Sequence, residues 1–240
     1  MKKFLLCGFA LLLPSQLWGD EVKERIAAKL SKHVPGITAD SVRESPMPGI
    51  YEVAAGTQII YVSADGAYAI LGDMIDLERQ RNVSETRRAE AIKGYLARFE
   101  KNEMLVIAPE DPKRFLTVFT DVDCPYCAQF HLDVPKLNEA GIEVRYLMFP
   151  RTGIGTRSYD RAVSVWCADD RIEAIGVAKA GGEVGARECT NPVTDHFNLG
   201  QEIGIRGTPT IILDDGRTLP GYVPAAKLIA QLGLEGSSAQ

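Results

Sequence analysis

The sequence predicts an α+β protein with a small N-terminal antiparallel sheet, a connecting helix and a larger C-terminal α/β domain. Three observations lead to this fold class. Short strand-like runs separated by turn residues fill the region 50–77. A single apolar stripe of helical period covers 82–100. From residue 115 onward, a strand-like run, a Cys-x-x-Cys sequence, a helical stretch and a second strand-like run follow one another.

Residues 1–19 have the composition of a secretory signal peptide. Two lysines follow Met1, an apolar run extends over 4–13, and Pro14 ends that run. The apolar run is much shorter than the roughly 20 residues that span a bilayer. Cys7 lies inside the run rather than after it, where a lipidated cysteine would stand. We therefore expect the protein to be exported, with cleavage after Gly19 and loss of Cys7.

The remaining chain is mildly acidic and carries no later segment of transmembrane length. The formal net charge is −5 at pH 7, and removal of Lys2 and Lys3 with the leader makes it more negative. This balance argues against nucleic acid and against an anionic membrane surface as partners. The length allows one large domain or two small ones.

The predicted N-terminal domain covers residues 20–80. It opens with a helix over 21–33, in which Val22, Ile26 and Leu30 share one face. Four strand-like runs follow, over 50–53, 58–62, 67–70 and 74–77. Because turn residues separate them, we expect an antiparallel meander. A domain of this size has little core of its own, so pairing with a second copy is expected.

A helix over 82–100 is the predicted linker, within a connecting segment of 81–104. Asn82 and Glu85 resemble a capping box, and the apolar stripe runs from Ala89 to Phe99. The alternative interpretation is an ordinary packing helix inside one of the two domains. The sequence does not separate these two possibilities.

The predicted C-terminal domain covers residues 105–240. A buried strand over 115–120 leads to a helix over 125–140 that contains Pro135, and a second strand follows over 142–149. We expect these two strands to be parallel. Two further helices, a hairpin around Asp215-Gly216 and a last helix are expected over 157–168, 195–203, 209–219 and 224–232. The order strand, Cys-x-x-Cys, helix, strand is typical of the thioredoxin fold.

Four cysteines remain after loss of the leader, and they allow three pairings. Spacing favours Cys124 with Cys127 and Cys167 with Cys189. The first ring is very small and stabilises the fold little. The second closes a longer loop and would contribute roughly 3 kcal/mol by the loop-entropy model. One pair therefore looks reactive and the other structural.

Cys124 is the predicted nucleophile because it falls at the start of a helix. Free backbone N–H groups and the positive end of the helix dipole favour a thiolate there. Cys127, one turn deeper, is placed to resolve a mixed disulfide formed at Cys124. Asp123 opposes the thiolate weakly if its charge faces water. We expect Cys124 to be the exposed member of the pair.

Two other roles for the motif are possible. The Cys-x-x-Cys pair could be a purely structural disulfide. A zinc site would need a second close pair or neighbouring histidines, which the spacing of Cys167 and Cys189 does not offer. We therefore expect neither a metal nor a cofactor.

No proton carrier for Cys127 can be assigned from the sequence. Asp121 and Glu143 are candidates, but the strand residue six positions before Cys124 is Val118, which is not an acid. His131 follows Cys127 by one helical turn and could shuttle protons. A lone helical histidine is more often a packing or surface residue.

Thr208-Pro209 is the second functional signal. A proline that opens a late strand in this fold is where a cis bond lies beside the cysteines. Such a bond would turn the N–H and C=O groups of Thr208 toward an extended substrate strand, which suits an enzyme that accepts many sequences.

The chain resembles the family of bacterial periplasmic disulfide isomerases that includes DsbC and DsbG. The matching segments are Phe119–Cys127, Val144–Arg151, Trp166–Ala168, Gly207–Pro209 and Pro220–Tyr222. The resemblance covers essentially the whole chain and is strongest from Phe99 onward.

This resemblance implies a V-shaped homodimer joined through the N-terminal domains, with the catalytic domains facing a shared cleft. It implies that incorrectly oxidised exported proteins are the substrates, and that a membrane thiol reductase of the DsbD type keeps Cys124 and Cys127 reduced. Cys167 and Cys189 then form a structural bridge. Pro125, Tyr126, Thr208 and Pro209 are the expected substrate-contacting residues.

One departure leaves the redox balance open. The best-known isomerase of the family has glycine at the position of Pro125, whereas DsbG also has a Pro-Tyr pair. The presence of Cys167 and Cys189 favours the DsbC type. A dithiol oxidase and a DsbG-like chaperone or reductase remain the alternative functions.

Overall fold

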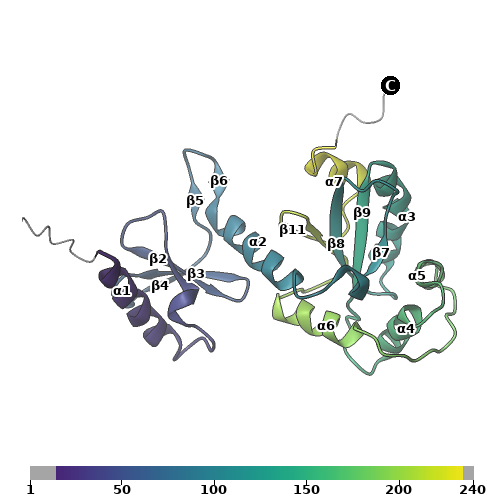
Figure 1. Ribbon diagram of the computed structural model, residues 1–240, viewed down its shortest axis with the longest axis horizontal. Helices are drawn as coiled ribbons and strands as arrows, with labels where there is room; N and C mark the ends of the chain where they lie inside the picture. Colours follow the sequence, from purple (N-terminus) through teal and green to yellow (C-terminus); the bar gives the residue numbers. More distant parts are fainter. Residues whose placement is uncertain (1–14, 235–240) are drawn as a thin grey trace, which may run out of the picture. The chain divides into compact units, whose positions relative to one another are not determined.

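The computed structural model describes residues 15–234, with side chains from residue 19 (Figure 1). The chain divides into two compact units, and the boundary along the sequence lies between Gly72 and Asp73. Most of the predicted leader lies outside the described residues, and 15–19 form the start of the first helix. Among the helices described, none has both the length and the apolar character needed to cross a bilayer.

In its described residues, the N-terminal unit is an antiparallel meander with one α-helix. Helix α1 (Ser15–Leu30) is followed by a short 3-10 turn, η1 (Ala39–Ser41), and by the strands β1 (Val42–Glu44), β2 (Ile50–Ala55), β3 (Gln58–Ser63) and β4 (Ala69–Leu71). The strand order is β1-β2-β3-β4, and all neighbours are antiparallel. Ile26 of α1 packs with Val53 and Ile60 in the core of this unit. The predicted meander is confirmed, and β1 was not predicted.

The predicted strand over 74–77 does not extend that sheet. It forms a separate hairpin of β5 (Ile75–Asp76) and β6 (Arg81–Asn82), which belongs to the second unit. The prediction was wrong about its partner because strand pattern alone does not specify pairing. Helix α2 (Val83–Leu96) begins directly after β6, and its N-cap Asn82 accepts a hydrogen bond from Glu85 N at 2.9 Å.

The apolar stripe of α2 packs inside the second unit. Ile92 lies in a cluster with Phe119 and Leu199. The turn at Gly216 approaches this helix closely, because a Cβ at that position would lie 2.2 Å from the Ala89 carbonyl oxygen. Gly216 also has a φ of +92°, so both the close contact and the backbone angle require glycine at this position. The linker role of this helix and the predicted domain boundaries stay predictions.

The second unit is built on a five-stranded mixed sheet of order β11-β10-β8-β9-β7 (Figure 1). The central pair β8–β9 is parallel as predicted, and the other neighbours are antiparallel. The strands are β7 (Leu105–Ile107), β8 (Arg114–Thr120), β9 (Ile142–Met148), β10 (Thr210–Leu213) and β11 (Thr218–Pro220). The short turn η2 (Lys101–Glu103) precedes β7.

Helices cover both faces of this sheet. They are α3 (Pro125–Glu139), α4 (Arg157–Trp166), α5 (Arg171–Lys179), α6 (Val193–Glu202) and α7 (Ala225–Gln231). Successive residues of β9 alternate between the two faces. Tyr146 packs with α3, α4, α5 and α7, whereas Leu147 packs with α2 and α6. Strands β6 and β7, the turn η2 and helix α5 were not predicted, and the other strands and helices of this unit lie within a few residues of their expected positions.

Candidate active site

The two cysteines occupy the first turn of α3. Cys124 is the N-cap, with extended backbone angles, and Pro125 follows as the first helical residue. Proline suits this position because its missing N–H would have no helical partner there. The Cys124 side chain forms no capping hydrogen bond, but the backbone N–H of Cys127 helps to lower the pKa of the Cys124 thiol. Cys124 and Cys127 are both thiols.

The sulfur of Cys124 contacts the loop before β10. Its Sγ lies 3.2 Å from the carbonyl oxygen of Thr208, and the Thr208-Pro209 bond is cis as expected. Two expectations need correction. Cys124 is only 2% exposed, since this loop covers it, so it is not open to water. The Thr208 carbonyl oxygen accepts a hydrogen bond from the Cys124 thiol, so it is not free to pair with a substrate strand.

The environment of Cys124 favours the thiolate. Burial by itself raises the pKa of the Cys124 thiol, but hydrogen bonds from Thr208 and Cys127 and the positive charge of Arg151 outweigh it. The net pKa of Cys124 lies below its ordinary value. A lowered pKa at a helix N-terminus is the property of an attacking cysteine.

Cys127 behaves in the opposite way. It is fully buried, and burial raises the pKa of its thiol. The positive charge of Lys179 and hydrogen bonds from Thr208 and Thr120 offset this only in part. The two cysteines therefore differ in the manner expected of an attacking and a resolving thiol.

The hydroxyl of Thr208 is buried beside the two sulfurs, and it makes no hydrogen bond of ordinary geometry while both are thiols. A hydroxyl can turn its proton toward an anion that forms beside it. Donation from Thr208 lowers the pKa of both cysteines, so this hydroxyl is a donor held ready for a thiolate.

Asp121 does not serve as a proton carrier for Cys127. Burial raises the pKa of Asp121, but hydrogen bonds from Ser158 and Arg151 hold it below its usual value. Ser158 Oγ donates at 2.7 Å, and both the backbone N and Nε of Arg151 donate to Oδ2. The carboxylate is thus fixed as the anchor of the turn that leads to Cys124.

Glu143 is also occupied elsewhere. Its carboxylate is buried between Lys101 Nζ at 2.5 Å and Arg145 Nε at 2.6 Å. Burial raises the pKa of Glu143, but these two cations lower it by more, so the net pKa lies below its ordinary value. Neither candidate carboxylate is available to Cys127, because each already neutralises a cation.

Asp123 opposes the Cys124 thiolate little. Its carboxylate forms an ion pair with Arg161 of α4, which cancels much of its charge. The sequence analysis expected the Asp123 charge to act weakly because it faces water. The ion pair with Arg161 is a further reason for a weak effect.

His131 is a packing residue in this structure. Its Nδ1 lies 3.1 Å from the hydroxyl of the buried Tyr146. Burial, followed by the charge of Lys179, lowers the pKa of His131 to about 4. The imidazole is therefore neutral at neutral pH.

Arg151 and Lys179 were missed by the sequence analysis. Arg151 follows β9, and the carboxyl ends of β8 and β9 lie at the same edge of the sheet because the strands are parallel. That rule could have placed Arg151 near Cys124. Lys179 gave no such signal, since its helix was not predicted and lysine is rarely buried.

The predicted substrate-contacting residues gather around the cysteines. Pro125 and Tyr126 stand between the two thiols, and Tyr126 is 63% exposed. Pro209 follows the carbonyl that contacts Cys124. An exposed aromatic ring beside a reactive thiol offers an apolar contact to a partner chain.

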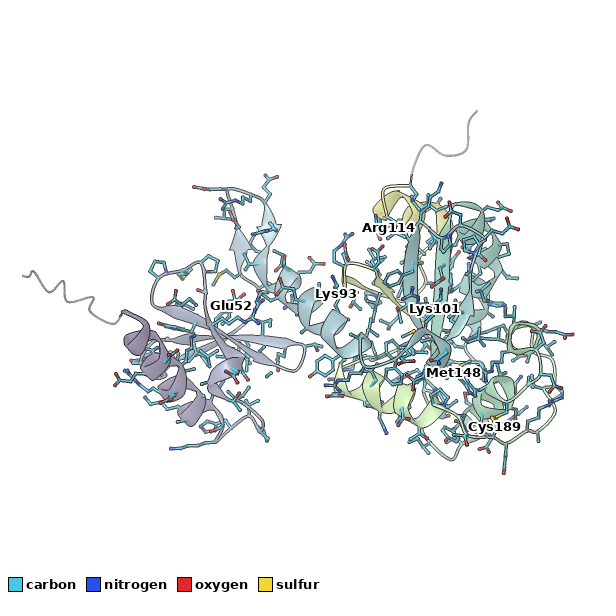
Figure 2. All side chains as sticks on the ribbon, in the orientation of Figure 1. Glu52, Lys93, Lys101, Arg114, Met148 and Cys189 are labelled. Carbon is cyan, nitrogen blue, oxygen red and sulfur yellow. A yellow bond between two sulfur atoms is a disulfide. The ribbon has the colours of Figure 1, made fainter. Side chains whose placement is uncertain are left out.

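Cys167 and Cys189 form a disulfide with a Cα–Cα distance of 5.7 Å (Figure 2). It links the end of α4 to the segment before α6 and lies apart from the reactive pair in the sequence. Within 15–234, no group of three or more potential ligand side chains is arranged to hold a metal ion.

Comparisons with known proteins agree with this geometry. A model described as "Thioredoxin-like domain" matches residues 101–234, and one described as "Disulfide bond isomerase protein N-terminal domain" matches 19–85. The thiol:disulfide interchange protein DsbC of Dickeya dadantii is 32% identical, covering 92% of each chain. That of Salmonella typhimurium is 36% identical over 78% of each chain.

A solved structure is also similar to part of this chain. The disulfide interchange protein from Neisseria gonorrhoeae has a TM-score of 0.50 and 28% identity, and the match covers 55% of this chain and 97% of that chain. With family models on both units and DsbC relatives aligned over most of their length, the chain belongs to the DsbC family of thiol:disulfide interchange proteins.

Proposed function

We propose that this protein isomerises or reduces incorrect disulfides in exported proteins, with Cys124 as the nucleophile and Cys127 as the resolving thiol. The observation that carries the proposal is the contrast between the two thiols. Cys124 has a lowered pKa at a helix N-terminus beside Thr208, whereas Cys127 is buried with a raised pKa. A dithiol with this asymmetry is suited to forming and then resolving a mixed disulfide.

In the first step, the Cys124 thiolate attacks one sulfur of a substrate disulfide. A new Cys124–substrate bond forms, the substrate disulfide breaks, and the second substrate sulfur leaves as a thiolate. The sulfur of Cys124 leaves the Thr208 carbonyl in this step. That carbonyl can then accept an N–H group from an extended substrate segment, as in other strand-addition complexes.

Two routes release the enzyme. In isomerisation, another thiolate of the same substrate attacks the mixed disulfide, so a different substrate disulfide forms and Cys124 leaves as a thiolate. In reduction, Cys127 attacks Cys124 Sγ, and the substrate departs with both of its sulfurs reduced. The second route leaves a Cys124–Cys127 disulfide, which a membrane thiol reductase of the DsbD type would return to two thiols.

Pro125, Tyr126, Thr208 and Pro209 are proposed to contact the substrate. Tyr126 supplies exposed apolar surface, and the backbone at Thr208 supplies pairing that does not depend on side-chain sequence. This combination suits an enzyme whose substrates share a misplaced disulfide rather than a motif.

A homodimer joined through the N-terminal units forms part of the proposal. Within the described part of the N-terminal unit, β4 pairs with β3 alone and leaves its other edge open. Tyr68, immediately before β4, and Ile70 and Leu71 within it are 75%, 60% and 69% exposed. An open edge strand with a row of apolar side chains is a favourable surface for pairing with an identical strand.

We place the protein in the periplasm, after removal of residues 1–19. The Cys167–Cys189 disulfide is consistent with an oxidising compartment. The reactive cysteines have to be kept reduced there, which is the task proposed for the membrane reductase.

Two measurements test the proposal: the rate of disulfide rearrangement, and the redox state of Cys124 and Cys127 in cells. Purified protein is mixed with a substrate whose disulfides have been scrambled, and recovery of the native pairing is followed with and without Cys124→Ser. Normal recovery by Cys124→Ser would overturn the proposal. Alkylation of thiols in intact cells tests the dithiol oxidase instead, since an oxidase would hold Cys124 and Cys127 mainly as a disulfide. A chaperone would keep preventing aggregation after both are replaced by alanine.

A further inference from the structure

Lys179, at the end of α5, is a buried lysine without an anionic partner. It is only 7% exposed, and lysine is almost never so buried unless it is paired. Within residues 19–234 it forms no ion pair. Its Nζ donates instead to Thr120 Oγ1 at 2.7 Å and to the Asp121 carbonyl oxygen at 2.6 Å, and both acceptors are neutral.

The packing of α5 against α3 places this lysine beside the reactive pair. Gly176, one turn before Lys179, faces His131 of α3, since a Cβ at Gly176 would lie 3.7 Å from His131 Nε2. The Asp121 carbonyl that accepts from Lys179 also accepts the backbone N–H of Cys124 at 3.2 Å. The ammonium therefore lies under the turn that carries the thiols.

The hydroxyl of Thr120 connects Lys179 with Cys127. A hydroxyl has one proton to donate and two lone pairs to accept. Because Thr120 Oγ1 accepts a hydrogen from Lys179, its own proton remains available. Donation of that proton to Cys127 lowers the pKa of the buried thiol, as does the charge of Lys179.

The other charged groups around Cys127 are already neutralised or uncharged. On the turn before α3, Asp121 forms an ion pair with Arg151, which lies in the loop after β9. Asp123 forms an ion pair with Arg161 of α4. His131 of α3 is neutral at neutral pH, and burial raises the pKa of Tyr146 of β9 well above its ordinary value. The anion that Lys179 lacks would be supplied by the Cys127 thiolate.

We propose that Lys179 is a positioning residue for the resolving step, in which its ammonium stabilises the thiolate of Cys127 through the Thr120 hydroxyl. The inference rests on the proposed role of Cys127. Lys179 supplies an ionisable group from helix α5, whereas Val118 on strand β8 supplies none. Burial lowers the pKa of Lys179 to about 8, so the ammonium form still predominates at neutral pH.

The step balances without another reactant. The thiolate of Cys127 attacks Cys124 Sγ, the Cys124–Cys127 bond forms, and the Cys124–substrate bond breaks. The substrate sulfur leaves with the electron pair of the broken bond. The proton that Cys127 has given up is matched by the proton that the departing substrate thiolate takes up.

A single experiment separates attack from resolution. The reduced, full-length protein is mixed with the chromogenic disulfide 5,5′-dithiobis(2-nitrobenzoic acid), and release of the coloured thiolate is followed by stopped flow between pH 6 and 9. The first equivalent reports attack by Cys124, and the second reports resolution by Cys127. Lys179→Met and Thr120→Val remove the ammonium and the hydroxyl with little change in size. Thr120→Ser and the exposed Lys136→Met are the matched controls.

We expect the second phase of Lys179→Met and Thr120→Val to slow about tenfold at pH 7, with its pH midpoint raised by about one unit. The first phase and both controls should stay within about threefold of the unchanged protein. The inference would be overturned if the second phase of Lys179→Met and Thr120→Val stayed within about threefold of the unchanged protein. It would also be overturned if the first and second phases slowed equally. An unchanged protein that shows no first phase would instead overturn the proposed function. Circular dichroism of each variant checks the fold.

Discussion

Cys124 Sγ lies 3.2 Å from the carbonyl oxygen of Thr208, the residue that precedes cis Pro209. The contact joins the N-terminus of α3 to the loop before β10, two segments far apart in the chain. It covers the nucleophile and occupies the backbone group that a substrate strand would use. Attack and substrate pairing are therefore coupled, because the thiol leaves this carbonyl when it forms a mixed disulfide.

Replacement of the two cysteines should separate the two release routes. Cys124→Ser should lower the rate of disulfide rearrangement by at least about 100-fold, because a hydroxyl is not ionised at neutral pH. Cys127→Ser should retain isomerisation by substrate thiols and accumulate a mixed disulfide. Mass spectrometry of acid-quenched reactions checks both outcomes. A Cys127→Ser protein that never forms the adduct would contradict the assignment of Cys124.

Arg151 should control the ionisation of Cys124. Its positive charge lowers the pKa of this thiol, so Arg151→Met should raise that pKa and slow alkylation of Cys124 at pH 7. The pH dependence of iodoacetamide labelling measures the change. Because Arg151 also holds Asp121, the exposed Arg157→Met is the control, and it should leave the profile unchanged.

The same lowered pKa has a consequence for stability. A thiol whose pKa is lower in the folded state than in the unfolded chain stabilises the fold when it is ionised. The contribution of Cys124 is therefore complete above the ordinary thiol pKa and is lost as the pH falls through its folded value. Urea unfolding of the reduced protein should show this increase with pH, and the increase should be smaller in Cys124→Ser by the contribution of this thiol.

The Cys167–Cys189 disulfide should contribute to stability and not to chemistry. Replacing both residues with alanine should cost roughly 3 kcal/mol by the loop-entropy model, or a fall of about 6–12 °C in Tm. Differential scanning calorimetry measures this fall. The attack rate of Cys124 at a temperature where the variant is folded should not change, and a tenfold loss would show that the bridge also shapes the site.

Burial of Lys179 should destabilise the reduced protein below about pH 8. Its pKa is lowered by burial to about 8, so the folded state disfavours the ammonium, and stability should rise as the pH increases from there toward the ordinary lysine pKa. Lys179→Met should remove this rise and stabilise the protein at pH 7 by about 1–3 kcal/mol. Urea titrations at pH 7 and pH 10 measure both effects, and an equal rise in the variant would contradict this account.

The open edge of β4 should determine the oligomeric state. Leu71→Lys places a charge on the apolar row of this edge, so the variant should sediment as a monomer where the unchanged protein forms dimers. Ile172→Lys, at an exposed apolar position on α5, is the control and should remain dimeric. A dimeric Leu71→Lys would locate the interface elsewhere.

Local patterns in the sequence determined much of this protein. The meander of β2, β3 and β4, the parallel pair β8–β9 and the position of Cys124 at the N-cap of α3 could be predicted, because period and turn residues act over a few neighbouring positions. The same holds for the Cys167–Cys189 pairing. The cis bond before Pro209 followed from the place of that proline in the fold.

Only the tertiary structure decided which groups surround the sulfurs. Asp121 and Glu143 looked available in the sequence, yet each is held by cations from distant segments. The sequence suggested that Cys124 is exposed, but in the structure its sulfur is buried against the Thr208 carbonyl. Lys179 became significant because α5 packs on α3 and brings an ammonium under Thr120. Burial and the electrostatics of a thiol depend on partners far apart in the chain, and no local pattern of residues encodes those distances.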